Sequence, residues 1–224
     1  MNLQICVPYR KCPFNCPTCI ANGRKRFDNL YKEDEKKYID TLKKEAINYD
    51  GFVLTGDTDP TLNKNWLEDI SKILYHYCNG GKIELQTRNY NLNNYDLTFI
   101  GVLSYSITNL SDYLKAWKFR KLSTGINRLV ILLTKDFNIL NVDTFNTMGF
   151  EQITFKVLHL SNDVETNEYI KTNRMEDYTN IYEIVKHYNG TNVSVRIDEN
   201  CQDSENRYKI FRSNGKIYNN WEEE

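Results

Sequence analysis

Short apolar runs occur at intervals along the chain and predict a series of β-strands. They are rich in Ile, Val, Leu, Phe and Tyr and are too short to be buried helices, which is typical of strands covered on both faces. We expect six strands of this kind, at residues 2–9, 51–56, 82–87, 102–108, 128–134 and 152–160.

Amphipathic stretches between these runs predict helices. Their apolar residues recur at three- and four-residue intervals, so each helix has one apolar side, and they cover residues 34–49, 65–77 and 175–189. Counting the short connections, the chain contains six strand-helix units. This alternation predicts an α/β fold with a parallel sheet, either curled into a partial barrel or open and doubly wound.

The last part of the chain has a different pattern and predicts further β structure. The run NVSVRID is strand-like, and Asn214-Gly215 is a strong hairpin signal between two more strand-like runs. We expect residues 1–189 to form the main sheet and residues 190–224 to form a C-terminal β extension packed on the same domain. Because a partly closed sheet leaves an exposed edge, the extension is expected to cover that edge.

Composition narrows the class of protein. The chain has 224 residues, of which 40% are hydrophobic and 26% charged, enough for one sizeable core. No apolar run approaches the length of a membrane span, and the N-terminus lacks the pattern of a secretory leader, so we expect a cytoplasmic protein that does not cross a membrane. A net charge of −1 predicts no binding to long nucleic acid.

Three of the six cysteines lie close together in the loop after the first predicted strand. Cys12, Cys16 and Cys19 have the spacing C-x3-C-x2-C, and a parallel sheet of this kind binds its ligands at the loops that follow its strands. Three thiolates are one too few for a closed zinc site, whereas they suit a [4Fe-4S] cluster with one iron left open. A zinc site completed by a His or by Cys78 is the alternative.

The three cysteines, in this spacing after a first strand, resemble the cluster motif of the radical SAM superfamily. The stretch LTGDTDPTLN, residues 54–63, is similar to the glycine-rich Gly-Gly-Glu-Pro segment of that family. Two differences are visible: the stretch is one residue longer and carries two acids, and position 18, which is often aromatic in the family, is Thr18. Independently of the family, a strand that ends in Thr-Gly-Asp-Thr offers backbone carbonyls to an ammonium group, and Gly56 permits close approach.

The resemblance implies a partial (β/α)6 barrel, a [4Fe-4S] cluster held by Cys12, Cys16 and Cys19, and S-adenosylmethionine bound to the open iron. It also implies the reaction: an electron from the reduced cluster cleaves the cofactor to a 5'-deoxyadenosyl radical, which abstracts hydrogen from a substrate. A flavodoxin or ferredoxin would supply the electron. The substrate is a small molecule, a nucleotide or a peptide, and an activase of a glycyl radical enzyme is one alternative. A non-enzymatic zinc or iron-sulfur module is another.

Cofactor-binding residues are expected at the ends of the strands. The glycine-rich stretch contributes Gly56, Asp57, Thr58 and Asp59. Three more are candidates by position on later strands, namely Ser106, Arg128 and Lys156. Lys156 is included because a charge that faces inward from a sheet buried on both sides needs a partner.

Other polar residues and cysteines have weaker claims. Thr87, Arg88 and Asn89 are noted only because they close the third predicted strand. Cys6, Cys78 and Cys201 are expected to have no role in a cluster. His159 is the one histidine near the proposed active face. No catalytic residue for the substrate step is identified.

Overall fold

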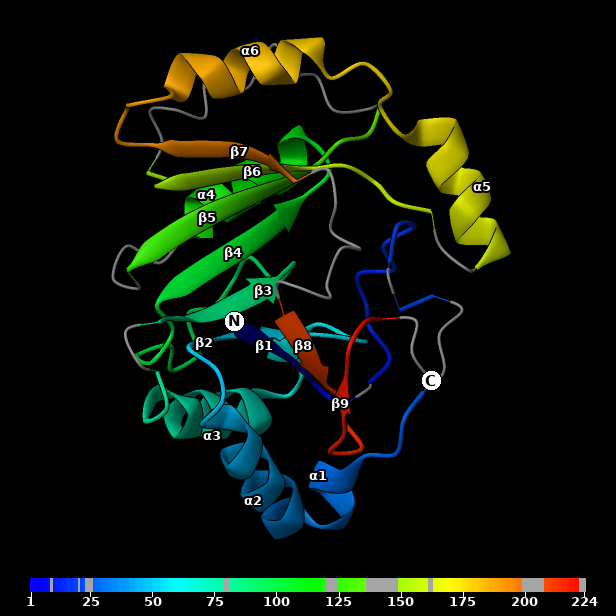
Figure 1. Ribbon diagram of the computed structural model, residues 1–224. Helices are drawn as coiled ribbons and strands as arrows, with labels where there is room; N and C mark the ends of the chain where they lie inside the picture. Colours follow the sequence, from blue (N-terminus) through cyan, green and yellow to red (C-terminus); the bar gives the residue numbers. More distant parts are fainter. Residues whose placement is uncertain are drawn as a thin grey trace.

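A single, mostly parallel sheet organises the chain. The structure is a computed structural model that describes residues 1–8, 10–19, 21–22, 26–78, 81–119, 125–135, 149–160, 163–198 and 208–221. Within these residues the sheet has nine strands in the order β7-β6-β5-β4-β3-β2-β1-β8-β9 (Figure 1). The strands are β1 (Asn2–Cys6), β2 (Gly51–Thr55), β3 (Ile83–Thr87), β4 (Val102–Ile107), β5 (Ile126–Leu132), β6 (Gln152–Lys156), β7 (Ser194–Asp198), β8 (Tyr208–Phe211) and β9 (Ile217–Tyr218).

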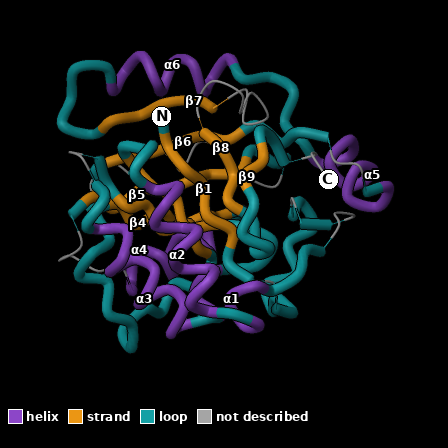
Figure 2. The backbone as a smooth tube through the Cα atoms, turned by 60° about the horizontal axis from the view of Figure 1, so that its bottom comes forward, coloured by secondary structure: helices purple, strands orange, loops and turns teal. Residues whose placement is uncertain are grey.

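Helices cover the outside of this sheet. In Figures 1 and 2, α2 and α3 lie together on one side, while α6 packs beside β7 and α5 lies apart from the other helices. Side-chain caps fix where α2 and α3 begin: Asp34 accepts from the amide of Lys37, and Asn63 accepts from the amide of Trp66. The helices are α1 (Leu30–Glu33), α2 (Glu35–Ala46), α3 (Lys64–Tyr75), α4 (Leu110–Phe119), α5 (Val164–Asn173) and α6 (Thr179–Tyr188), with a 3-10 turn η1 (Pro60–Leu62).

The two faces of the sheet differ in chemistry. Alternate residues of each strand, such as Leu3, Leu85 and Leu129, pack with Tyr38 of α2 and Trp66 of α3 in one buried apolar core. The residues between them form the opposite face, and several of these are polar. The apolar face therefore binds the helices, and the polar face remains for the interior of the partial barrel.

Polar side chains on the inner face bind one another near the amino ends of the strands. Glu84 on β3 accepts from the hydroxyl of Ser104 on β4 at 2.8 Å and from the guanidinium of Arg128 on β5. Arg128 Nε in turn donates to Gln152 Oε1 on β6 at 2.8 Å. These contacts join four neighbouring strands and form a hydrogen-bonded floor of the barrel.

The predicted α/β fold with a parallel sheet is confirmed, with differences in detail. All six predicted strands are present, and the connection between β3 and β4 contains no helix in place of the expected alternation. The helices α1, α4 and α5 lie outside the three predicted ranges, and the apolar residues of α5 show little periodicity. The connection between β5 and β6 lies mostly outside the described residues.

Strands of the C-terminal segment join the sheet at both of its edges. β7, expected within the extension, pairs in parallel with β6. β8 pairs in parallel with β1 and forms an antiparallel hairpin with β9, whose turn contains Gly215 at φ 77° as the Asn-Gly signal predicts. The division of the chain at residue 189 stays a prediction. Within the described residues, no helix has the length and apolar character needed to cross a membrane.

Candidate functional site

The cysteine loop follows β1 at the carboxyl edge of the sheet. Cys12, Cys16 and Cys19 are free thiols, each half-buried. The amide of Cys19 donates to the carbonyl of Cys16 at 3.0 Å, and Asn15 has a left-handed backbone with φ 41°, which asparagine tolerates well. This turn brings Cys16 and Cys19 near one another, and Cys12 is near enough to both to act on them electrostatically.

Contacts among the described residues attach this loop to the rest of the barrel at three points. Arg10 Nη1 donates to the carbonyl of Leu62 at 3.1 Å, which joins the loop to the turn after β2. Beyond the cysteines, Asn22 Nδ2 donates to Thr166 Oγ1 of α5 at 2.9 Å. The third contact is made by Arg88, described below. The loop is therefore held at its start, its middle and its end.

Burial makes the thiols of Cys16 and Cys19 weaker acids. It raises the pKa of Cys16, although the Arg88 guanidinium opposes the rise, and it raises the pKa of Cys19 against a backbone hydrogen bond. Among the described residues, no three His, Cys, Asp or Glu side chains lie close enough together to hold a metal ion. A cluster places each thiolate on a different iron, so its ligands are farther apart than those of one ion, and three free thiols in one loop suit that donor set.

Gly56 lies where the glycine-rich stretch passes close to β1. Its φ is +133°, and a Cβ at this position would be 2.8 Å from the Cα of Cys6. The missing side chain was expected to leave room for a ligand. The structure shows that it leaves room for the backbone of β1, directly before the cysteine loop.

The two acids of the stretch are engaged by the protein. Asp57 forms a buried ion pair with Arg212, which follows β8, at 3.1 Å. Asp59 accepts from the Thr61 amide and hydroxyl at 3.0 and 2.7 Å, from the Thr87 hydroxyl at 2.9 Å and from the Arg88 amide at 2.7 Å. Burial raises the pKa of Asp59, while these hydrogen bonds oppose the rise. Both carboxylates thus have partners within the protein, and the cofactor contacts predicted for Asp57 and Asp59 stay predictions.

Thr58, between the two acids, is different. Its side-chain hydroxyl is buried, with the residue 7% exposed, and it makes no hydrogen bond within the part of the chain that the structure describes. A buried hydroxyl without a partner is costly. Of the four predicted residues in this stretch, Thr58 is therefore the one with an open polar group for a ligand.

The three predicted residues on later strands lie at different positions along their strands. Ser106 is half-buried near the end of β4, and its carbonyl accepts from the hydroxyl of Tyr90 at 2.9 Å. Lys156 ends β6, opposite Asp198 of β7. Arg128 lies near the start of β5, where Glu84 and Gln152 engage it in the barrel floor. Arg128 therefore has structural partners, and its predicted cofactor contact stays a prediction.

Arg88 contacts the cysteine loop, a role that the sequence did not predict. It directly follows β3, and its guanidinium donates to Cys16 Sγ at 3.1 Å and to Asp112 of α4 at 2.6 Å. Position alone marked it in the sequence, because nothing local indicates which loop it reaches. The capping pattern at Asn109, whose Oδ1 accepts from the Asp112 amide, marks the start of α4 in the sequence but does not indicate that Asp112 pairs with Arg88.

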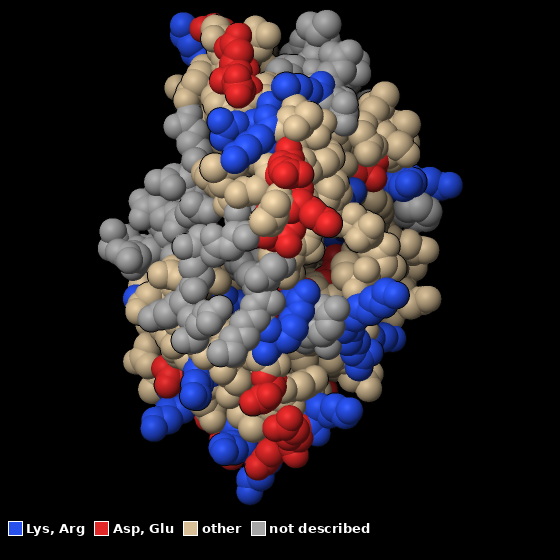
Figure 3. Space-filling view, turned by 90° about the vertical axis from the view of Figure 1, so that its right-hand side faces the viewer, with Lys and Arg blue, Asp and Glu red and all other residues tan. Residues whose placement is uncertain are grey.

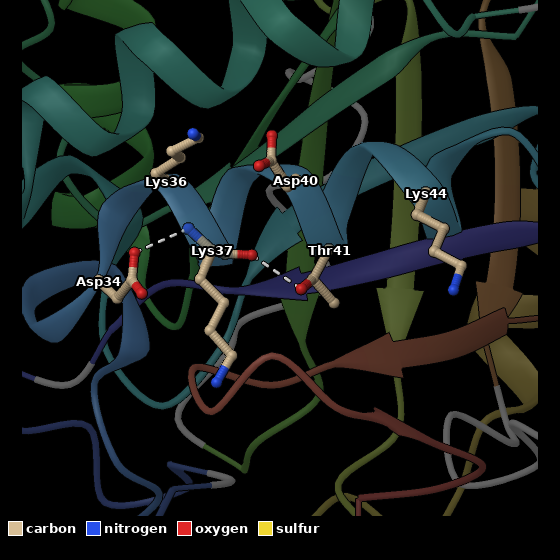
Figure 4. Close-up of a pocket in the computed structure, with 6 residues that line it drawn as sticks. All are labelled: Asp34, Lys36, Lys37, Asp40, Thr41 and Lys44. Atoms are coloured by element: carbon tan, nitrogen blue, oxygen red, sulfur yellow. Dashed lines mark hydrogen bonds between the residues drawn. The ribbon is translucent and has the colours of Figure 1, made fainter.

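Other surface features lie away from this site. A hollow on the outer side of α2 is lined by Asp34, Lys36, Lys37, Asp40, Thr41 and Lys44 (Figure 4). Its lining makes hydrogen bonds local to the helix, such as Thr41 Oγ1 to the carbonyl of Lys37. On the side of the molecule in Figure 3, the described basic groups are interspersed with acidic groups and form no continuous basic surface.

Comparisons with known proteins identify the fold. No protein-family model matches the sequence, and no curated protein matches it. A solved structure of native anSMEcpe with bound AdoMet and Kp18Cys peptide, a radical SAM enzyme, aligns with a TM-score of 0.57 at 13% identity over 97% of this chain and 73% of that one. A structure of BtrN in complex with AdoMet and 2-DOIA aligns at 11% identity over 99% of this chain and 73% of that one, with a TM-score of 0.38. The first likeness shows that the chain has the partial-barrel fold of a radical SAM enzyme.

Proposed function

We propose that this protein is a radical SAM enzyme, which cleaves S-adenosylmethionine reductively at a single [4Fe-4S] cluster held by Cys12, Cys16 and Cys19. One observation carries the proposal: three free, half-buried thiols occupy the loop after β1, beside the glycine-rich stretch, in a partial barrel of this fold. Arg88 connects the two loops, because its side chain contacts Cys16 and its amide contacts Asp59.

Different residues would bind the cluster and S-adenosylmethionine. Each of the three thiolates would bind one iron and leave the fourth iron for the cofactor. The unpartnered hydroxyl of Thr58 would accept a hydrogen bond from the cofactor's amino group, which has three donors. Ser106 and Lys156 remain candidates for other parts of the cofactor, because both end strands on the inner face.

Held by Cys12, Cys16 and Cys19, a bound cluster would supply the electron for reductive cleavage of S-adenosylmethionine to methionine and the 5'-deoxyadenosyl radical that would take hydrogen from the substrate. The protein contributes position and shielding. The cysteine loop follows β1 at the carboxyl edge of the sheet, and its attachments to Leu62 and Thr166 limit its movement. A small redox protein such as a flavodoxin or ferredoxin would reduce the cluster.

Anaerobic reconstitution with iron and sulfide tests the proposal. The wild-type protein should bind about four irons per chain and, with dithionite and S-adenosylmethionine, release 5'-deoxyadenosine. Cys12→Ala, Cys16→Ala and Cys19→Ala should each lose both properties, because the cluster then lacks one of its three protein ligands.

Cys78→Ala is the matched control, since Cys78 is a half-buried thiol after α3 and outside the loop. It should retain iron and cleavage. A Cys16→Ala protein that still assembles the cluster and cleaves the cofactor at the wild-type rate contradicts the proposal. Colourless wild-type protein with one bound zinc would instead support the zinc alternative.

A further inference from the structure

Arg88 makes a direct contact with one of the proposed cluster ligands. Its Nη1 donates to Cys16 Sγ at 3.1 Å, across 72 residues of sequence. The Arg88 side chain is only 18% exposed, so water screens this contact weakly.

The guanidinium is oriented from its other side by Asp112. Arg88 Nη2 lies 2.6 Å from Asp112 Oδ2, and the Asp112 side chain is 11% exposed. Asp112 is itself fixed, because the same oxygen accepts from the amide of Thr108 at 3.2 Å and from its hydroxyl at 2.9 Å. The carboxylate therefore holds the planar fork of the arginine toward the cysteine loop.

The backbone of Arg88 is fixed as well. Its amide donates to Asp59 Oδ2 at 2.7 Å, and Asp59 also accepts from the hydroxyl of Thr87. Arg88 thus joins the loops after β1 and β2 to the first turn of α4. A long side chain held at its backbone and at one end of its guanidinium loses little further entropy when it binds a sulfur.

We propose that Arg88 is a positioning residue that orients Cys16 and, by donating to its sulfur, raises the reduction potential of the cluster. This inference rests on the cluster proposed above. Reduction adds negative charge to a cluster, and a permanent cation hydrogen-bonded to a ligating sulfur stabilises that state. Asp112 partly neutralises the charge of Arg88, so the reduction potential depends on both the hydrogen bond to sulfur and the net local charge.

The reduction potential separates this role from a merely structural one. Reconstituted wild-type, Arg88→Gln and Arg88→Lys proteins are titrated anaerobically, and the reduced cluster is followed by electron paramagnetic resonance. We expect the midpoint of Arg88→Gln to shift to more negative potential, with iron content equal to that of the wild type. Arg88→Lys keeps the positive charge but lacks the planar guanidinium, so its midpoint potential should shift less in the same direction.

Arg174→Gln is the matched control, because Arg174 is an arginine away from the cysteine loop whose side chain is 39% exposed and pairs with Glu176 at 3.9 Å. An Arg88→Gln midpoint equal to that of this control overturns the inference. If Arg88→Gln binds no iron, Arg88→Lys decides: a more negative midpoint supports the inference and a wild-type midpoint overturns it. Failure of the wild-type protein to bind a cluster refutes the proposed function instead, so the two failures are distinguishable.

Discussion

Replacing Arg212 by Met should destabilise the folded protein by about 3–5 kcal/mol, because it leaves the Asp57 carboxylate buried without its cation. The two side chains are 1% and 2% exposed and lie 3.1 Å apart. Arg212 also donates to the carbonyl of Trp221 at 2.8 Å. Methionine fills a similar volume, so the loss should come mainly from charge and hydrogen bonding.

The aromatic rings around Arg212 add to this cost. Its guanidinium carbon lies 4.6 Å from the centroid of the Trp221 ring and 5.1 Å from that of Phe27. A desolvated cation over an aromatic face contributes about 2 kcal/mol or more to stability. Part of this contribution is already included in the loss of about 3–5 kcal/mol predicted for Arg212→Met. For a chain of this size, the predicted loss corresponds to a decrease of roughly 6–20 °C in Tm.

Urea and thermal unfolding of the purified protein measure the effect. Asp57→Asn should also be strongly destabilising, whereas the double variant Asp57→Asn/Arg212→Met should lose less than the sum of the two, because it leaves neither charge alone. Arg174→Gln, at an exposed pair, should change the free energy of unfolding by no more than about 0.5 kcal/mol. An Arg212→Met protein as stable as this control refutes the reasoning.

Two further predictions concern the glycine-rich stretch and the end of β6. Gly56→Ala should destabilise the protein more than Gly190→Ala. Both glycines have a positive φ, which costs an alanine about 1–2 kcal/mol, but only at Gly56 does the new Cβ also meet the backbone of β1. Equal losses of stability in urea unfolding would contradict this. Burial, together with the nearby Lys156 ammonium, lowers the pKa of His159 in the folded state, so protons bind the unfolded chain better and stability should fall as pH drops below about 6.5. His159→Gln should make that decline shallower, and a profile identical to the wild type would refute the assignment.

The sequence by itself determined the features that depend on neighbouring residues. The six predicted strands, the turn at Asn214-Gly215 and the loop with Cys12, Cys16 and Cys19 all follow from patterns a few residues long. Strand periodicity and turn chemistry act locally, so they can be recognised without the fold. The alternation of strands and helices then limited the fold class to a parallel sheet.

Only the tertiary structure decided which distant groups meet. Asp57 pairs with Arg212, 155 residues away, because β8 lies beside β1 and brings the segment after it to the end of β2. Arg88 reaches Cys16 because the loops after β1 and β3 converge at one edge of the sheet. A charged side chain in the sequence does not specify its partner, since strand order sets the distances and electrostatic interactions depend on distance and burial.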